Sequence, residues 1–338
     1  GVFLIGPYTG KFVKGYKDYI LGGGRFGILL LMGTIVATQW GGGSFLGIAG
    51  FGYEQLYRGV WYALATIPRF LIWAFLLAII IRKVQPYTIS EWFALRYDSK
   101  NGMLVSIINL IIGIGLLGSQ FVAFGNIVAT FMNYDLTTSI IIGAIIVGIY
   151  TIIGGLIAVA VTDVVQLFIA LFAVLGVLGA CIARVGTFAQ IRMALPEQYF
   201  NPANPYGVFF MVTIFMLWMA DIPMQYVIQR ISSAKTLKVA FWGPVCGALS
   251  FVLLGYISPA IGAYAKVLLP NLARPDMAYP ALLTEVLNPY LAALAAAGLM
   301  AAVMSTGDSY LLAPATLMSN DFFRLIKPNA TEKQSLVA

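Results

Sequence analysis

Hydroxyl-bearing side chains recur on one face of an apolar segment near the end of the chain, GLMAAVMSTGDSYLLAPATLMSNDFFR at 298–324. In a helix, Ala302 and three later hydroxyl residues would share that face, because they stand at positions i, i+3, i+4 and i+7. The three are Ser305, Thr306 and Ser309. Hydroxyl and carbonyl oxygens are the ligands of hard cations, so this face predicts a site for a monovalent cation. The alternative is ordinary hydrogen bonding by Ser and Thr between membrane helices.

A second source of cation ligands is predicted in the apolar run VATQWGGGSFLGIAGFGY at 36–53, which contains Gly41, Gly42 and Gly43. Each glycine costs a helix interior about 1 kcal/mol relative to alanine. Non-helical backbone at membrane depth persists only where it is buried in protein or lines a cavity. A helix break here would leave carbonyl groups free for a cation and N–H groups free for a substrate anion. The alternative is close helix packing through Gly43 and Gly47, a GxxxG spacing.

Two charged residues lie deep inside apolar segments, Arg69 in ATIPRFLIW and Asp221 in MADIPMQ. An ionisable residue within a membrane is a functional hypothesis by default, with a partner to name. In one reading Asp221 pairs with Arg69. In the other, a substrate carboxylate binds Arg69 through two hydrogen bonds while Asp221 takes a substrate ammonium. The two readings are compatible, and the second predicts an amino acid or another carboxylate-bearing solute.

Asp163 is a further carboxylate in an apolar run, GGLIAVAVTDVVQLFIA at 154–170. Burying it without compensation costs several kcal/mol (~2.5–3.5 on insertion scales), so we expect a partner or a water-filled path. Gln166 shares its helix face at i+3. The alternative is a carboxylate at a helix start, where it is favourable to the helix dipole.

The elements that must position these residues are predicted to be membrane-spanning helices. The chain has 338 residues, 60% of them apolar and 10% charged, with a mean hydropathy of +0.90. A soluble protein of this size needs more charge to cover its surface, so we predict an all-α polytopic membrane protein. A span needs roughly 20 apolar residues, and eight full spans are predicted at 26–50, 58–82, 102–132, 137–154, 156–183, 206–231, 237–268 and 289–318.

The residue types present exclude several classes of site. The sequence has no histidine, which rules out histidine-based metal sites, catalytic bases and proton relays. It has neither an HExxH motif nor paired catalytic carboxylates, so an intramembrane enzyme is not expected. Cys181 and Cys246 lie in apolar segments without CxxC spacing, and we interpret them as small core residues.

Basic residues fall mainly on one side of the predicted spans. Alternation assigns fourteen of the 20 Lys and Arg residues to one side and five to the other, with Arg69 inside a span. The positive-inside rule makes the first side cytoplasmic, so the net charge of +7 reflects topology rather than nucleic-acid binding. The fourteen are Lys11, Lys14, Lys17, Arg25, Arg82, Lys83, Arg96, Lys100, Arg230, Lys235, Lys238, Arg324, Lys327 and Lys333.

The two interrupted spans are the first, with QWGGG, and the sixth, with Asp221 and Pro223. Paired broken helices in corresponding positions point to an inverted-repeat transporter whose site lies at the midplane. A channel should instead show a continuous polar stripe over several helices, and the polar residues here gather at the midplane. A sensor that keeps the whole site is a further alternative.

The chain resembles the sodium/solute symporter family. The segments that carry the resemblance occur in family order: YKDYILGGGRFG, ATQWGGGSFLGIAGFGY, YTISEWFALRY, GGLIAVAVTDVVQ, QYVIQRISSAK and AAVMSTGDS. It implies a LeuT-type fold of two inverted five-helix repeats in one transporter domain, 1–338. We expect 1–25 to hold the remnant of a leading helix and a cytoplasmic loop, 26–183 the first repeat, and 206–338 a second repeat without its last helices.

The resemblance also implies a sodium site between the first and eighth core helices. Its ligands would be the carbonyls of Ala37, Trp40 and Ala302 with the hydroxyls of Ser305 and Thr306. Some family members bind a second sodium nearby, where Asp163, Asp308 and Ser309 stand beside Ser305 in this chain. Asp163 matches an acidic residue on the inner sodium path; Asp308 replaces a serine of those members and is alternatively a structural carboxylate. Sodium is the one metal ion expected, with no transition metal.

For the solute, the resemblance implies a site between the two broken helices. The candidate residues are Gln39, Gly41, Gly42, Gly43, Ser44, Arg69, Asp221, Gln225 and Tyr226. Tyr226 matches an inner-gate tyrosine of sugar-transporting members, or is an aromatic residue at a packing surface. The GGG run is most similar to the high-affinity choline branch, but that branch has aromatic residues where Gln39, Met224 and Arg69 stand here. Cation–π contacts hold a quaternary ammonium, so choline is a second choice.

These observations predict a symporter in which sodium flowing inward drives import of a small polar solute by alternating access. Its partners would be the solute, Na⁺ and the lipid bilayer, with no nucleic acid. We expect it in the plasma membrane, as a bacterial or archaeal inner-membrane protein. Proton coupling through Asp163 and a non-transporting sensor are the remaining variants.

Overall fold

The computed structural model describes residues 8–132, 134–203 and 207–337, and within these ranges it contains helices and no strand. A single isolated bridge joins Phe26 to Ala234 there. The predicted tail of a leading span, GVFLIGP, lies outside the described residues. The helices are α2 Tyr16–Leu21, α3 Ile28–Gln39, α4 Ile48–Glu54, α5 Leu56–Leu64, α6 Ile67–Ile72, α7 Ala78–Val84, α8 Ile89–Arg96, α9 Ser99–Met132, α10 Leu136–Val185, α11 Phe188–Ala194, α12 Gly207–Met219, α13 Gln225–Ser233, α14 Leu237–Leu268, α15 Ala278–Val286, α16 Pro289–Leu317, α17 Arg324–Ile326 and α18 Glu332–Val337.

Five stretches of the described chain are long and apolar enough to cross a membrane, and a sixth is counted if a bent helix pair is one span. The bent pair is α3 with Gly43–Glu54, which meet at 56°. Two of the eight predicted spans are shorter than expected: 137–154 contains an apolar helix over Leu136–Ile149, and 206–231 is divided between α12 and α13. The division between α12 and α13 has a clear cause, because Pro223 cannot donate a helical hydrogen bond.

Gly155 separates the predicted spans 137–154 and 156–183, which the structure joins in α10. Its backbone has φ 54° and ψ −152°, a combination that is essentially restricted to glycine. A Cβ atom at this position would lie 2.6 Å from the carbonyl oxygen of Tyr19. The chain therefore changes direction at Gly155 while α2 packs closely against the corner.

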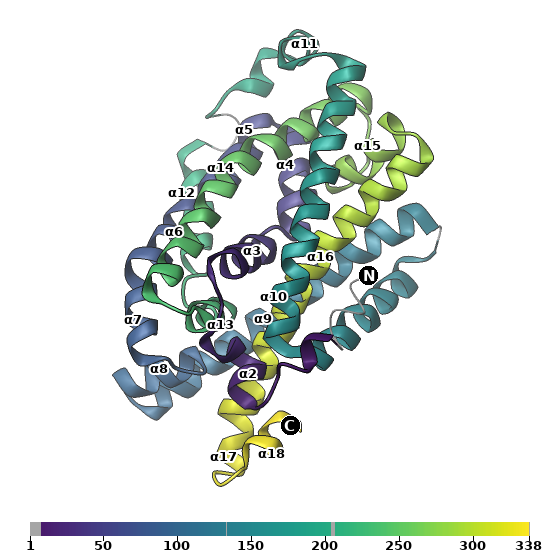
Figure 1. Ribbon diagram of the computed structural model, residues 1–338. Helices are drawn as coiled ribbons and strands as arrows, with labels where there is room; N and C mark the ends of the chain where they lie inside the picture. The colour runs from purple at the N-terminus through teal and green to yellow at the C-terminus, as the bar shows by residue number, and fades with distance from the viewer. Residues whose placement is uncertain (1–7, 133, 204–206, 338) are drawn as a thin grey trace.

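The broken helix α3 lies at the centre of the bundle (Figure 1), in contact with α10, α14 and α16. α16 runs along both α10 and α9, and α14 packs against α4 and α5. This arrangement buries α3 from Leu31 to its end at Gln39 except for Met32. The polar residues of α3 must therefore find their partners on neighbouring helices.

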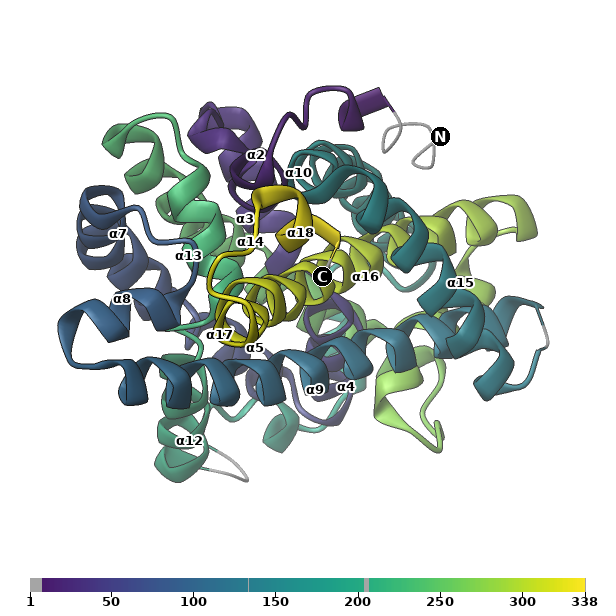
Figure 2. The ribbon, with the colours of Figure 1, turned by 90° about the horizontal axis from the view of Figure 1, so that it is seen from below.

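The connecting elements gather at the two ends of the bundle. α2, α8, α17 and α18 lie at one end, and α11 and α15 lie at the other (Figure 1). Seen from below, α18 and α17 cover the middle of the first end, with α8 beside them (Figure 2). Lys17 and Arg96, both predicted to be cytoplasmic, belong to helices of this end. Arg230 does not follow the prediction: it lies within α13 and is 2% exposed, so it is not a loop residue.

Candidate functional site

The first helix break begins where α3 ends at Gln39. The N–H of Trp40 is shared between the carbonyls of Val36 and Ala37, each at 3.1 Å. The N–H of Gly42 instead donates to the side chain of Gln120 in α9, with 2.9 Å between Gly42 N and Gln120 Oε1. A side chain from a neighbouring helix therefore satisfies backbone that the break releases, as buried backbone in a membrane requires.

Two of the three glycines are required by close approach. A Cβ atom on Gly41 would lie 2.3 Å from Thr306 Oγ1, and one on Gly42 would lie 2.4 Å from the Cβ of Ala123. Gly43 is different, since it is exposed and a Cβ atom there would meet nothing within 4 Å. The break thus brings the α3 end against α16 and α9 through Gly41 and Gly42.

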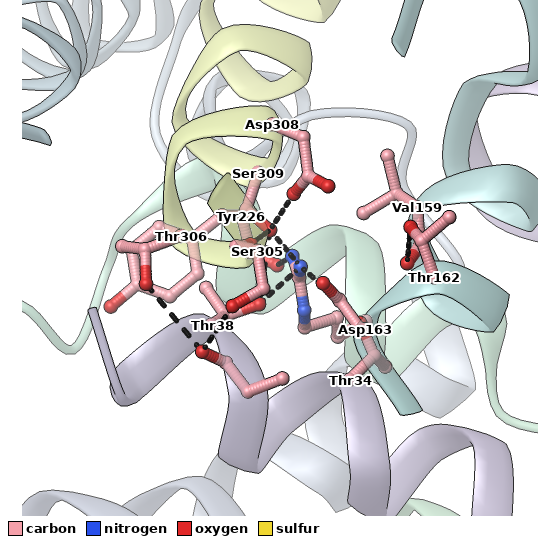
Figure 3. A network of polar contacts seen from close by, with 12 residues as sticks. Thr34, Thr38, Val159, Thr162, Asp163, Tyr226, Ser305, Thr306, Asp308 and Ser309 are labelled. Carbon is pink, nitrogen blue, oxygen red and sulfur yellow. Dashed lines mark hydrogen bonds and ion pairs between the residues drawn. The ribbon is translucent and has the colours of Figure 1, made fainter. Parts of the chain in front are cut away.

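Four of the five residues predicted to bind sodium contact one another through oxygen atoms; Figure 3 shows two of them, Ser305 and Thr306. Ser305 Oγ lies 3.1 Å from the Ala37 carbonyl oxygen and 2.8 Å from that of Ala302. Thr306 Oγ1 lies 3.5 Å and 3.3 Å from the same two atoms. The fifth residue, Trp40, is buried and immediately precedes Gly41, the residue that touches Thr306.

This oxygen cluster has the chemistry of a cation site. Ser305 and Thr306 are at most 3% exposed, so a cation here would be held by protein oxygens rather than by bulk water. Each hydroxyl carries one proton and two lone pairs. Rotation of the O–H bond away from the centre would present a lone pair to a cation, while the carbonyls of Ala37 and Ala302 already point their oxygens toward these hydroxyls.

Four predicted solute residues form a closed ring of polar contacts between the two broken helices and α6. Arg69 forms an ion pair with Asp221, and its Nη2 donates to Gln39 Oε1 at 2.6 Å. Gln39 Nε2 donates to the Tyr226 hydroxyl at 2.8 Å. The Tyr226 hydroxyl donates in turn to Asp221 Oδ2 at 2.5 Å. The ring pairs the buried cation with the carboxylate and gives each charge further hydrogen bonds, while Nε of Arg69 is buried without a hydrogen-bond partner among the described residues.

The guanidinium of Arg69 is enclosed by aromatic rings. Its central carbon lies 4.0 Å from the ring centroid of Trp218 and 5.1 Å from those of Phe70 and Trp73. The side chain of Arg69 is completely buried, whereas that of Asp221 is 12% exposed. The faces that could stack on an organic cation are therefore occupied by a cation of the protein itself.

Two other predicted solute residues have different surroundings. Ser44 Oγ donates to the carbonyl oxygen of Gln39 at 2.5 Å and so closes the break locally. Gln225 is not part of the ring: its Oε1 accepts from the N–H of Ile89 at 2.8 Å, and its Nε2 donates to the Tyr87 carbonyl at 3.0 Å. Its amide thus joins α13 to Tyr87 and to the first residue of α8. Gln225 therefore lies outside the ring that Arg69, Asp221 and Tyr226 form with Gln39.

A second polar cluster lies around Asp163, which is fully buried. Its Oδ2 accepts from Thr34 Oγ1 at 2.5 Å and lies 3.6 Å from Nη2 of Arg230. Ser309 Oγ lies 3.1 Å from Asp308 Oδ1, and it also accepts from Arg230. Asp163, Asp308 and Ser309, the three residues predicted for a second sodium, are therefore gathered on the α16 and α10 side of α3 (Figure 3).

Sequence reasoning missed several site residues, among them Arg230, Gln120, Thr34 and Thr38, of which Thr38 Oγ1 lies 3.0 Å from Ser309 Oγ. Alternation assigned Arg230 to the cytoplasmic side, although a signal for the site was present: it stands at i+4 from Tyr226 on the same helix face. Nη1 of Arg230 donates to the Tyr226 carbonyl at 3.2 Å. Gln120 is an amide within a long apolar run, and such a residue calls for a partner in a membrane helix.

A cavity of about 10 Å³ separates the two clusters. It is lined by Gln39 and Tyr226 of the ring and by Thr38 and Arg230 of the Asp163 cluster, among others. A space of this size holds about one water molecule. The ring and the Asp163 cluster are thus neighbours, joined by the hydrogen bond from Arg230 to the Tyr226 carbonyl.

Comparison with known proteins identifies a matching family. Residues 19–338 match the model of the sodium:solute symporter family. The chain is 27% identical to the sodium/pantothenate symporter of Haemophilus influenzae, with 99% of this chain and 73% of that protein covered. It is 26% identical to the human high affinity choline transporter 1, with 93% and 58% covered.

Among solved structures, the chain is similar to the substrate-bound, outward-open state of a Na⁺-coupled sialic acid symporter, with a TM-score of 0.90. The sequences are 20% identical, and the match covers 99% of this chain and 75% of the other. A likeness at this identity reports on the fold. The predicted all-α, LeuT-type bundle with broken first and sixth core helices is confirmed.

Proposed function

The chain belongs to the sodium:solute symporter family, and from this premise we propose that it couples inward movement of Na⁺ to import of a small polar organic solute, with an amino acid or another carboxylate-bearing solute favoured. Family membership and the apolar helices make it a multi-pass membrane transporter and not an enzyme. We place it in the plasma membrane, as a bacterial or archaeal inner-membrane protein. We treat 26–183 and 206–338 as its two repeats.

For sodium, we propose the oxygen cluster at the α3 break. The ligands are the carbonyls of Ala37, Trp40 and Ala302 with the hydroxyls of Ser305 and Thr306. A cation in this position would tie the broken helix α3 to α16, because its ligands come from both. Differential affinity of the ion for the state in which these helices are joined would couple sodium binding to the alternating-access equilibrium.

The proposed class of solute rests on one observation, the ring of polar contacts formed by Arg69, Asp221, Tyr226 and Gln39. A carboxylate can replace Asp221 on Arg69, since a guanidinium binds any carboxylate in the same planar geometry. The released Asp221 would then be available to an ammonium group on the same solute. An amino acid has both a carboxylate for Arg69 and an ammonium for Asp221. Several of the similar symporters are named for solutes that carry a carboxylate, namely pantothenate, proline and sialic acid.

Choline is the weaker alternative for a physical reason. A quaternary ammonium needs free aromatic faces, and Arg69 already lies over the rings of Trp218 and Trp73. To admit choline, the guanidinium would have to leave a fully buried position beside Asp221. A carboxylate-bearing solute uses that guanidinium instead of displacing it.

The test is sodium-dependent uptake in proteoliposomes, screened over amino acids, other carboxylates, sugars and quaternary amines. We expect an amino acid or carboxylate to be taken up with Na⁺. Uptake should be lost in Arg69→Ala while sodium still raises the melting temperature of that variant. Uptake of choline alone would refute the solute assignment. Uptake driven by a pH gradient and insensitive to Na⁺ would refute sodium coupling, and solute binding without any uptake would indicate a sensor.

A further inference from the structure

Each of the two helix breaks places a backbone N–H against an amide side chain of α9. At the first break, Gly42 N lies 2.9 Å from Gln120 Oε1. At the second break, between α12 and α13, Gln225 N lies 2.9 Å from Asn109 Oδ1. Both amides are buried, and a backbone N–H at membrane depth is costly unless it has such an acceptor. One helix therefore caps both breaks.

Asn109 and Gln120 lie on one face of α9, because they stand at positions i and i+11 and three helical turns take about 11 residues. Gly113 lies on the same face, and a Cβ atom there would be 2.8 Å from Cγ of Pro314 in α16. Seen from below, α9 extends across the bundle (Figure 2). The packed face of α9 thus reaches both broken helices.

Each amide is oriented by its own helix so that its oxygen faces the break. Nδ2 of Asn109 donates to the Val105 carbonyl at 3.2 Å, and Nε2 of Gln120 lies 3.3 Å from Ser119 Oγ. Met224, the residue that precedes α13, makes no side-chain hydrogen bond to cap that helix. Asn109 therefore takes the place of an N-cap side chain from a different helix.

Each capped N–H lies beside one of the two proposed sites. Gly42 follows Gly41, the residue that approaches Thr306 of the sodium site. Gln225 precedes Tyr226, whose hydroxyl is a member of the ring. The first bond therefore fixes backbone at the sodium site, and the second fixes backbone at the solute ring.

We propose that Asn109 and Gln120 are positioning residues for transport. Gln120 holds the sodium site in place through Gly42. Asn109 holds the solute ring in place through Gln225. α9 thereby sets the geometry of both sites, although it supplies none of the proposed ligands. The inference rests on the proposed function, which assigns the ion to the first break and the solute to the ring.

A positioning role differs from a purely structural one in what each amide controls. A side chain that only stabilised the bundle would affect the binding of Na⁺ and of solute alike. A positioning residue affects the site at its own break. Hydrogen bonds between membrane helices contribute modestly, so losing one should change an affinity by about 3- to 20-fold.

The experiment compares Gln120→Met and Asn109→Leu, which remove the acceptor oxygen at similar side-chain volume, with the control Asn126→Leu. Asn126 is a buried amide of the same helix, and within the described chain it bonds to neither break. Na⁺ affinity is measured without solute. Initial uptake of an equimolar mixture of radiolabelled amino acids is measured in proteoliposomes at saturating Na⁺ and low solute concentration. Hydrogen exchange is followed at the N–H groups of Gly42 and Gln225.

We expect Gln120→Met to weaken Na⁺ binding by about 3- to 20-fold and to speed exchange at Gly42, with uptake at saturating Na⁺ unchanged. Asn109→Leu should lower uptake by a similar factor and speed exchange at Gln225, with Na⁺ binding unchanged. Asn126→Leu should match the wild type in all three measurements.

Equal effects of the two variants on Na⁺ binding and on uptake would overturn the inference, and so would unchanged exchange at Gly42 in Gln120→Met. Fast exchange at Gly42 or Gln225 in the wild type would overturn it even where a variant does not fold. Failure of the proposed function has a different signature, since the wild type would then bind no Na⁺ and show no uptake. The exchange rates would in that case still decide whether α9 caps the two breaks.

Discussion

Replacing Gly41 by alanine adds one methyl group at the closest approach between the α3 break and α16. The new Cβ would lie 2.3 Å from Thr306 Oγ1 and 2.7 Å from both Thr306 Cβ and Gln120 Oε1. Carbon atoms in good contact are about 3.5–4.0 Å apart. Either Thr306 or the end of α3 must therefore move by roughly an ångström, and both belong to the proposed sodium site.

The cost of this movement can be estimated from overpacking. Inserting one methyl group into a packed interior costs about 1–3 kcal/mol. If the strain falls on the sodium-bound state, in which the helices are joined most tightly, the dissociation constant for Na⁺ rises by about 5- to 150-fold. The loss of affinity would come from a residue that contributes no side chain to the site.

The assay is sodium titration of the melting temperature, repeated as direct Na⁺ binding, on Gly41→Ala and on Gly43→Ala. Gly43 is the matched control because the same methyl group there meets nothing within 4 Å. We expect Gly43→Ala to keep the wild-type affinity. Wild-type affinity in a folded Gly41→Ala, or an equal loss in both variants, would refute the argument from close approach.

Three further predictions concern other parts of the molecule. Tyr226→Phe removes the hydroxyl that joins Gln39 to Asp221, and losing it costs about 1–3 kcal/mol when the partners stay buried. The KM for solute should therefore rise at least about fivefold, while sodium binding is retained. An unchanged KM would exclude the ring from solute binding. Gly155→Ala forces a side chain into a backbone conformation that costs about 1–3 kcal/mol, and a denaturant midpoint equal to that of the wild type would contradict this. Burial raises the pKa of Tyr16 to about 12 from 10.0, so the folded state favours the neutral phenol and loses stability as the pH rises from about 10 to about 12. The free energy of unfolding of Tyr16→Phe, measured against pH, should depend less on pH over that range. An equal pH dependence in the variant would point to another group.

Much of the architecture could be predicted from the sequence, because the bilayer imposes strong constraints. Runs of apolar residues predicted the long helices, and Gly41–Gly43 and Pro223 marked the two breaks. A break is visible in sequence because it needs residues that a helix disfavours. The contact between Arg69 and Asp221 followed from the same reasoning, since a deep charge in a membrane needs a partner.

Arg230 and Gln225 show which contacts sequence reasoning could not predict. Both follow the non-helical turn before α13, and a turn resets the rotation of the next helix, so periodicity cannot say which face Gln225 presents. Arg230 was assigned by alternation to the connection that follows the sixth predicted span. That assignment does not say how deeply a short helix such as α13 is buried in the bundle. Its burial depends on contacts with α16, α7 and α3.

The ion pair of Arg69 and Asp221 also has a consequence for how the protein is made. The two residues are 152 positions apart in the chain. At about 5–20 residues per second, the ribosome adds Asp221 roughly 8–30 seconds after Arg69. The segment Leu56–Val84 must therefore enter the membrane with an unpaired arginine, at a cost of about 2.5–3.5 kcal/mol on insertion scales. Phe70 and Trp73 belong to the same segment and lie beside Arg69. Their rings can shield the guanidinium from the lipid before Asp221 is synthesised.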